Sequence, residues 1–219
     1  MTPSKCFAIV AAGLITTSVF ALGVSAQIPT VPVLQNGFVS TGMTLAINYG
    51  SASGSTAYAF AAGWGPATGR FQVSAALGGV RPDSGGTWTG YGGRVAVPVY
   101  SDATGRLGVA LFAGVGGASR DTTSIVRVPV GVGVGYRAPL GATRSVAAYA
   151  SPFFVWSRLS ERGARAQGDN AMRGSVALDL VLTRNVGLTA GYEFGGGSSE
   201  GSFGAGSGLF GAAVSYAFR

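Results

Sequence analysis

The residue types in this chain set narrow limits on the chemistry that it could perform. It contains no histidine, the usual general base near neutral pH. Its single cysteine is Cys6, so the rest of the chain can form no thiolate metal site. Asp179 and Glu193 could act as a carboxylate pair, but they occupy different segments at different expected depths. The sequence therefore predicts a protein that is not an enzyme and that holds neither a cofactor nor a metal.

One glycine-rich stretch has a superficial likeness to a nucleotide-binding motif. Residues 131–135 read GVGVG, within the longer run IVRVPVGVGVGYR of residues 125–137. A dinucleotide-binding motif needs a helix directly after its glycines, whereas a turn and another alternating run follow here. A phosphate-binding loop needs a lysine, and the only lysine of the chain is Lys5. These glycines are therefore interpreted as packing positions in a strand.

Composition and the first residues indicate export into a membrane. The chain is 47% hydrophobic and only 11% charged, whereas soluble domains carry about 25% charged residues. Residues 1–26 contain a basic start, a short apolar run and small residues at the end, which predicts a signal peptide cleaved between Ala26 and Gln27. The alternative, an uncleaved helix, is disfavoured because the run is short and polar in its middle. No later segment has the ~18 apolar residues of a spanning helix.

Only a closed β-barrel can otherwise span lipid, because it pairs every backbone N–H and C=O. Ten runs of alternating apolar and small residues follow one another, separated by clusters of Gly, Ser, Asp and Pro. They cover residues 37–49, 57–65, 71–80, 87–100, 107–117, 125–137, 145–157, 171–182, 186–195 and 208–218. The sequence predicts an all-β, closed, antiparallel up-and-down transmembrane barrel over residues 37–219. Ten strands are expected, with eight or twelve as alternatives, and residues 27–36 are expected as a short periplasmic segment.

The connections between these runs alternate between two kinds. Those at 66–70, 101–106, 139–144 and 183–185 are tight and similar to one another, whereas those at 50–56, 81–86, 118–124, 158–170 and 196–207 vary. Outer-membrane barrels have short periplasmic turns and longer external loops, so the first set is expected to face the periplasm. Both termini would then lie on that side.

Small residues inside a narrow barrel and bulky residues toward lipid explain the alternation. Arginine at the lipid-facing midplane costs ~2–4 kcal/mol, so the charged residues within the runs should point inward. This assigns five residues to the lumen: Arg94, Arg127, Arg173, Asp179 and Glu193. Two interpretations stay open, an ion-pair network that fills the lumen or a narrow water-filled pore that favours anions. The run at 145–157 has aromatic residues in both parities, so its faces are not assigned.

The last strand carries a motif that resembles a known family. Val214, Tyr216 and Phe218 match the alternating apolar residues, ending in aromatic-x-Phe, of small Gram-negative outer-membrane barrels of the OmpA and OmpX type. In that family the motif is read by the barrel-assembly machinery. The family's motif usually ends on the phenylalanine itself, whereas here Arg219 follows Phe218. The resemblance implies an outer-membrane location and a barrel fold. It implies no particular activity.

The preferred interpretation is an integral outer-membrane component whose lumen is largely filled and whose short loops contact lipopolysaccharide. Guanidinium groups bind phosphates, so Arg158, Arg162 and Arg165 are the candidate contacts. The alternative is a narrow, porin-like diffusion channel for small solutes, with a preference for anions. An adhesin or receptor is disfavoured by the short loops. Nucleic-acid binding is not expected, because the basic residues are scattered.

Overall fold

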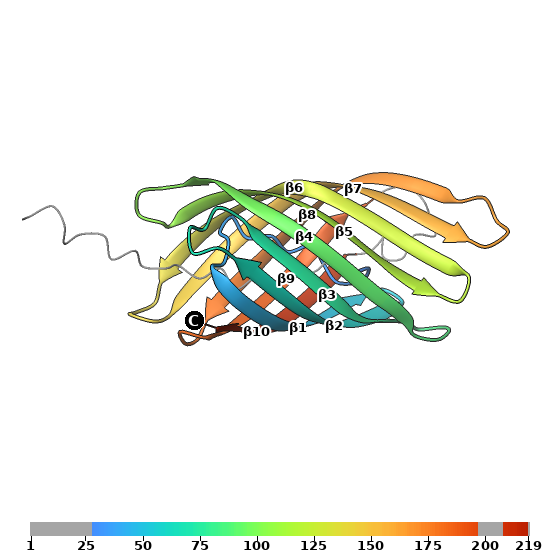
Figure 1. Ribbon diagram of the computed structural model, residues 1–219, viewed down its shortest axis with the longest axis horizontal. Coiled ribbons are helices and arrows are strands. Elements are labelled where there is room, and N and C mark those ends of the chain that lie inside the picture. Colours follow the sequence, from blue (N-terminus) through green and yellow to red (C-terminus); the bar gives the residue numbers. More distant parts are fainter. Residues whose placement is uncertain (1–27, 197–207, 219) are drawn as a thin grey trace, which may run out of the picture.

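A computed structural model describes residues 28–196 and 208–218. Within these ranges the chain forms ten strands: β1 (Gly42–Ala52), β2 (Ser55–Gly65), β3 (Gln72–Pro82), β4 (Trp88–Ser101), β5 (Leu107–Arg120), β6 (Thr123–Pro139), β7 (Ser145–Glu161), β8 (Gln167–Val181), β9 (Val186–Gly195) and β10 (Leu209–Phe218). Each strand pairs antiparallel with its sequence neighbours, and β1 pairs with β10, which closes the barrel (Figure 1). This confirms the predicted closed, antiparallel, ten-stranded barrel. No helix in the described part of the chain is long and apolar enough to cross a membrane.

The alternation of side chains along the strands sets the two faces of the wall. In β6, Val130 and Val134 are exposed on the outside, whereas Arg127, Gly133 and Gly135 are buried on the inside. Strand β7, whose faces the sequence did not resolve, also alternates: its odd-numbered residues 147–155 are buried, and the even-numbered residues between them are exposed. A period of two places bulky groups outside and small or polar groups inside.

Some strands are longer than the sequence pattern predicts. Strand β7 continues to Glu161 and β8 begins at Gln167, so the expected loop 158–170 is reduced to residues 162–166. Strands β4 to β8 have 14 to 17 residues, against 10 or 11 in the other five, so the wall is taller on that side (Figure 1). We call the end with connections 66–71, 102–106, 140–144 and 182–185 the turn mouth. The opposite end is the loop mouth.

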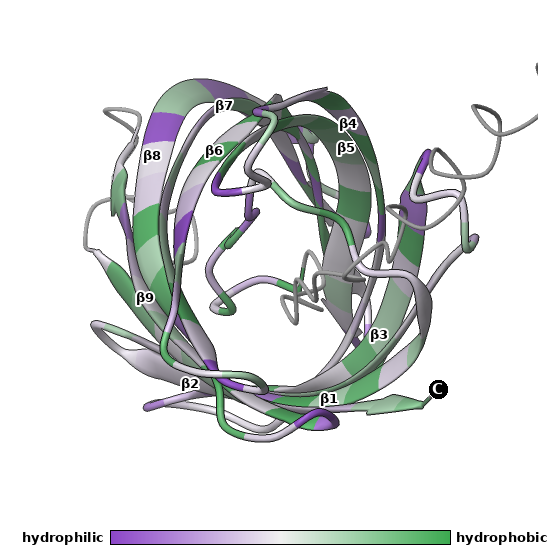
Figure 2. Cartoon of the chain, turned by 90° about the vertical axis from the view of Figure 1, so that its left-hand side faces the viewer, coloured by the Kyte–Doolittle hydropathy of each residue, from purple (hydrophilic) through white to green (hydrophobic). Residues whose placement is uncertain are grey.

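The segment before β1 lies inside the barrel. Residues 28–36 are all buried, and an end-on view shows this stretch of chain within the ring of strands (Figure 2). The segment passes from the loop mouth, where the hydroxyl groups of Thr30 and Ser55 lie 3.1 Å apart, to the turn mouth, where β1 begins. The expectation of a short periplasmic segment at 27–36 is thus corrected: residues 28–36 fill the lumen. We call residues 28–41 the lumen segment.

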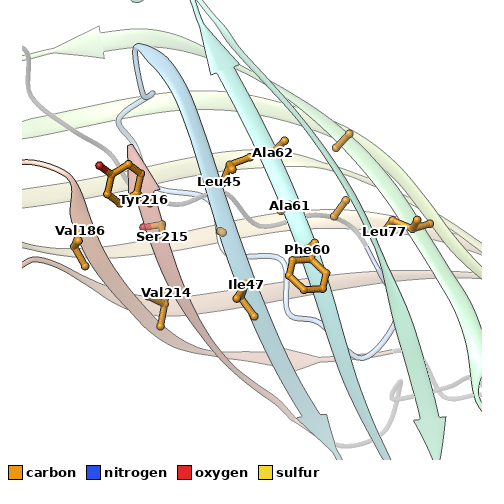
Figure 3. Close-up of a pocket in the computed structure, with 13 residues that line it drawn as sticks. Leu45, Ile47, Phe60, Ala61, Ala62, Leu77, Val186, Val214, Ser215 and Tyr216 are labelled. Atoms are coloured by element: carbon orange, nitrogen blue, oxygen red, sulfur yellow. The ribbon is translucent and has the colours of Figure 1, made fainter. Parts of the chain in front are cut away.

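A broad apolar hollow of about 660 Å³ lies on the outer wall across β9, β10, β1, β2 and β3. Side chains from neighbouring strands, such as Ile47, Phe60 and Val214, stand on this outer side (Figure 3). Its lining is aliphatic and aromatic apart from Ser215 and the Tyr216 hydroxyl. The hollow therefore offers little to bind a polar substrate, and polar side chains are concentrated in the lumen instead.

Candidate functional site

A buried carboxylate joins two arginines inside the barrel. Glu193 on β9 is fully buried, and its Oε1 atom lies 2.5 Å from Nε of Arg173 and 3.3 Å from Nη2 of Arg127. The register of β8 and β9 puts Arg173 opposite Gly195, two residues beyond Glu193. Arg173 and Glu193 are therefore close neighbours on adjacent strands of the wall. Strand β6 is not adjacent to β9, so Arg127 reaches Glu193 across the lumen. We call these three residues the Glu193 cluster.

A second buried carboxylate accepts hydrogen bonds from three directions. Asp179 on β8 accepts from the hydroxyl of Thr189 at 2.7 Å, from that of Tyr149 at 3.2 Å, and from the amide of Asn36 at 2.8 Å. Thr189 lies directly opposite Asp179 in the sheet, whereas Asn36 belongs to the lumen segment. This set of donors satisfies a charge that would otherwise be costly to bury. It also ties the segment to the wall near the turn mouth.

The barrel wall binds the backbone of the lumen segment at three consecutive residues. Glu193 accepts from the amide of Val33 at 2.7 Å, and the Ser175 hydroxyl donates to its carbonyl at 2.6 Å. Arg94 donates to the Leu34 carbonyl at 2.9 Å. The Ser151 hydroxyl donates to the Gln35 carbonyl at 2.7 Å and lies 3.3 Å from the Gln35 amide, which donates to it. Strands β4, β7, β8 and β9 all contribute to these contacts.

Wall glycines leave the space that the side chains and backbone of the segment occupy. A Cβ atom at Gly211 would lie 2.3 Å from Pro32, and one at Gly191 would lie 2.8 Å from Leu34. Similar overlaps occur between other glycines of the wall and the segment, at Gly50, Gly65, Gly90, Gly108, Gly133 and Gly135. The small residues inside the barrel therefore have a specific occupant. That occupant is the chain's own residues 28–41.

The lumen-facing charges predicted from the sequence are all buried, at 0% to 8% exposure. The structure brings Arg127, Arg173 and Glu193 together, whereas Arg94 and Asp179 each bind the lumen segment separately. A sixth charged residue was missed: Arg137 is buried on β6, with its guanidinium 4.0 Å from the centre of the Phe38 ring. The same alternation that assigned Arg127 to the inside also points Arg137 inward.

The remaining candidate residues lie on the surface or outside the described ranges. Arg158 is exposed on the outer face of β7, and Arg162 and Arg165 are exposed in the connection after it. The side chains of Val214, Tyr216 and Phe218 all point outward from β10, and the last two rings pack 5.0 Å apart. The predicted signal peptide, with its cleavage site at Ala26 and Gln27, and the connection 197–207 are not among the described residues.

The arrangement defines a closed β-barrel whose lumen is occupied by its own chain. In the described part of the chain no group of three or more His, Cys, Asp or Glu side chains could hold a metal ion.

Comparison with known proteins adds a likeness of shape. No protein-family model matches the chain, and no curated protein matches it. Among solved structures, a KdgM porin in complex with disordered oligogalacturonate is similar, with a TM-score of 0.41 and 11% identity. A second KdgM porin structure gives a TM-score of 0.38, also at 11% identity. Each comparison covers 80% of this chain and 99% of the porin.

Proposed function

We propose that this protein is an integral component of the outer membrane, a barrel that spans the lipid and is closed by its own lumen segment. The observation that best supports this proposal is the outer wall, where every strand exposes large apolar side chains. Examples, one from each strand in order, are Ile47, Phe60, Leu77, Val97, Leu111, Val130, Phe154, Leu178, Leu188 and Val214. A water-soluble protein rarely exposes contiguous apolar surface beyond a few hundred Å². Acyl chains are the solvent that suits such a wall.

The filled lumen favours a structural role over steady transport. Glu193, Arg94, Ser151 and Ser175 all bind the lumen segment, and a solute crossing the barrel would have to replace these contacts. The porin-like alternative has one observation in its favour: the wall buries four arginines against two carboxylates, and the lumen segment carries no charge. An open lumen would therefore attract anions. We propose the closed barrel as the resting form and no enzymatic role.

Two partners are proposed from surface residues. The exposed Arg158, Arg162 and Arg165 stand at the loop mouth, where bidentate guanidinium contacts to the phosphates of lipopolysaccharide would stabilise the barrel. The outward side chains of Val214, Tyr216 and Phe218 are available to the barrel-assembly machinery during insertion. The lipopolysaccharide proposal puts the loop mouth at the cell exterior, and the tight connections then face the periplasm, as is usual for outer-membrane barrels.

Reconstitution tests the location directly. The chain without residues 1–26 is refolded with vesicles of outer-membrane phospholipid and lipopolysaccharide, then extracted with carbonate at high pH. We expect the folded protein to stay with the vesicles and to be released only by detergent. A folded protein that remains in the aqueous phase without detergent would contradict the proposal.

A further inference from the structure

We propose that the lumen is a peptide-binding site whose resident ligand is the chain's own segment 28–38. The ligand class is an extended, uncharged, proline-containing peptide, and the resident segment exchanges with such a peptide supplied from outside. This inference rests on the proposed function, since it requires a barrel that spans a membrane. It goes further by assigning a ligand to the interior.

The segment is separate from the wall that holds it. All ten strands are paired on both sides, and β1 closes directly on β10, so residues 28–41 contribute no strand to the barrel. Within the described residues, the segment is covalently continuous with the wall only at Gly42, whose φ of +76° gives a sharp change of direction that favours glycine. The barrel can therefore stay closed as a sheet while the segment moves.

Recognition of the segment uses backbone groups, as in other proteins that bind extended peptides. Val33 and Gln35 each have both their N–H and their C=O bound by wall side chains, and the carbonyl of Leu34 between them is bound by Arg94. Such contacts accept any side chain that fits, except that proline, which has no N–H, is excluded at the positions of Val33 and Gln35. Their donors and acceptors belong to four different strands, so the wall surrounds the peptide.

Side-chain fit supplies selectivity. Pro32 occupies the space over Gly211, and Leu34 occupies the space over Gly191, beside Tyr149 and Ala177. The segment from Ile28 to Phe38 contains neither a charged nor an aromatic residue until its last position. A peptide with a charge at the Leu34 position would bring that charge among apolar groups, which is unfavourable without a partner.

The first test uses the full mature chain with Ser151→Ala and Ser175→Ala together. These substitutions remove three hydrogen bonds to the segment and leave the strand backbone intact. In planar bilayers we expect the fraction of recording time during which the barrel conducts ions to rise by roughly tenfold or more over wild type. The matched control is Ser74→Ala with Ser215→Ala, two buried wall serines, of which Ser215 donates to the Gly187 carbonyl of the wall. An equal effect of both pairs would overturn the inference.

A disulfide lock identifies the moving part. The Thr30 and Ser55 hydroxyl oxygens are 3.1 Å apart, so Thr30→Cys combined with Ser55→Cys places two thiols close enough to form a disulfide with little movement. In the Ser151→Ala, Ser175→Ala background, the lock should abolish the openings, and a reductant should restore them. Openings that persist in the oxidised form would show that another part of the chain moves, and would overturn the inference.

A synthetic peptide with the sequence of residues 28–38 tests binding in trans. Added to the open Ser151→Ala, Ser175→Ala barrel, it should shorten the open periods in a dose-dependent manner. The same peptide with arginine in place of leucine at the position of Leu34 should not. Openings unaffected by the first peptide, or equally affected by both, would overturn the inference.

Carbonate extraction of the same preparation separates failure of the proposed function from failure of the peptide site. A protein that is lost from the vesicles contradicts the proposed location, whereas one that stays inserted and silent contradicts only the peptide site.

Discussion

The backbone amide of Val33 donates to Oε2 of Glu193 over 2.7 Å, while the other oxygen of the same carboxylate faces Arg127 and Arg173. One side chain of the wall therefore links the lumen segment to the largest ion-pair cluster in the described structure. The two arginines partly neutralise its negative charge, and its second oxygen accepts the hydrogen bond from the lumen segment. The Glu193 cluster stabilises both the barrel interior and the position of the segment.

Replacing Glu193 should destabilise the barrel strongly. Glu193→Ala leaves two buried arginines and one amide without their acceptor, and breaking a buried ion pair in this way costs about 3–5 kcal/mol. Urea-induced unfolding in lipid vesicles, followed by tryptophan fluorescence, would measure the loss. Glu161→Ala, which removes an exposed carboxylate at the end of β7, is the control and should change stability little. Equal effects would mean that the Glu193 cluster is not a stabilising contact.

The orientation of β6 predicts a sharp contrast between two arginine substitutions. Val130 is 52% exposed near the middle of β6, whereas Leu140 is 56% exposed in a turn. If the outer wall faces lipid, Val130→Arg should destabilise the inserted barrel by ~2–4 kcal/mol, and Leu140→Arg should have a much smaller effect. Unfolding in vesicles of both variants beside wild type gives the comparison. Similar losses at the two positions would contradict a lipid-facing β6.

The turn between β4 and β5 has a carboxylate with a shifted titration. The pKa of Asp102 is lowered from 3.8, first by the hydroxyl of Thr104 and then by the amide of Leu107, which donates to it at 2.8 Å. Because the pKa of Asp102 is lower in the folded state, its ionised carboxylate stabilises the folded protein. This stabilisation is present above pH 3.8 and is lost as the pH falls through the pKa of the folded state. Carbon-13 NMR should give Asp102 a midpoint below 3.8 that rises in Thr104→Val. An unchanged midpoint in that variant would exclude the hydroxyl as the cause.

Binding to lipopolysaccharide should depend on which mouth carries the substituted arginines. Changing Arg158, Arg162 and Arg165 together to glutamine removes three exposed positive charges at the loop mouth. We expect weaker and less salt-sensitive binding to lipopolysaccharide vesicles, by roughly threefold or more, since exposed ionic contacts each contribute up to about 1 kcal/mol. The same change at Arg70, Arg106 and Arg144, all exposed at the turn mouth, is the matched control. A reversal of the two results would invert the proposed orientation.

Much of the barrel could be predicted from the sequence because one physical rule governs every strand. Lipid outside and limited space inside force a period of two, and β6 shows this rule over residues 125–137. Strand ends were less predictable: β7 and β8 extend into the expected loop, since their polar residues there still pair backbone to backbone, for example Arg158 with Gly168. Water at a barrel mouth accepts polar side chains, so polarity alone does not end a strand.

The occupant of the lumen could not be predicted from the pattern. Residues 28–36 lack alternation and contain Pro29 and Pro32, which is typical of an irregular segment in any environment. Only the three-dimensional fit reveals why the wall is so rich in glycine: Gly133 and Gly211, for example, lie where a Cβ atom would overlap the segment. The sequence indicated small residues inside but not the peptide that they accommodate.

Single-channel recording of the full mature wild-type protein in planar bilayers tests the closed barrel most directly. The lumen segment is held by Glu193, Arg94, Ser151 and Asp179, so we expect inserted protein without steady conductance. Insertion is verified by carbonate extraction of the same preparation. A steady conductance whose ion selectivity changes in Arg94→Ala would contradict the closed barrel and would establish a porin-like channel.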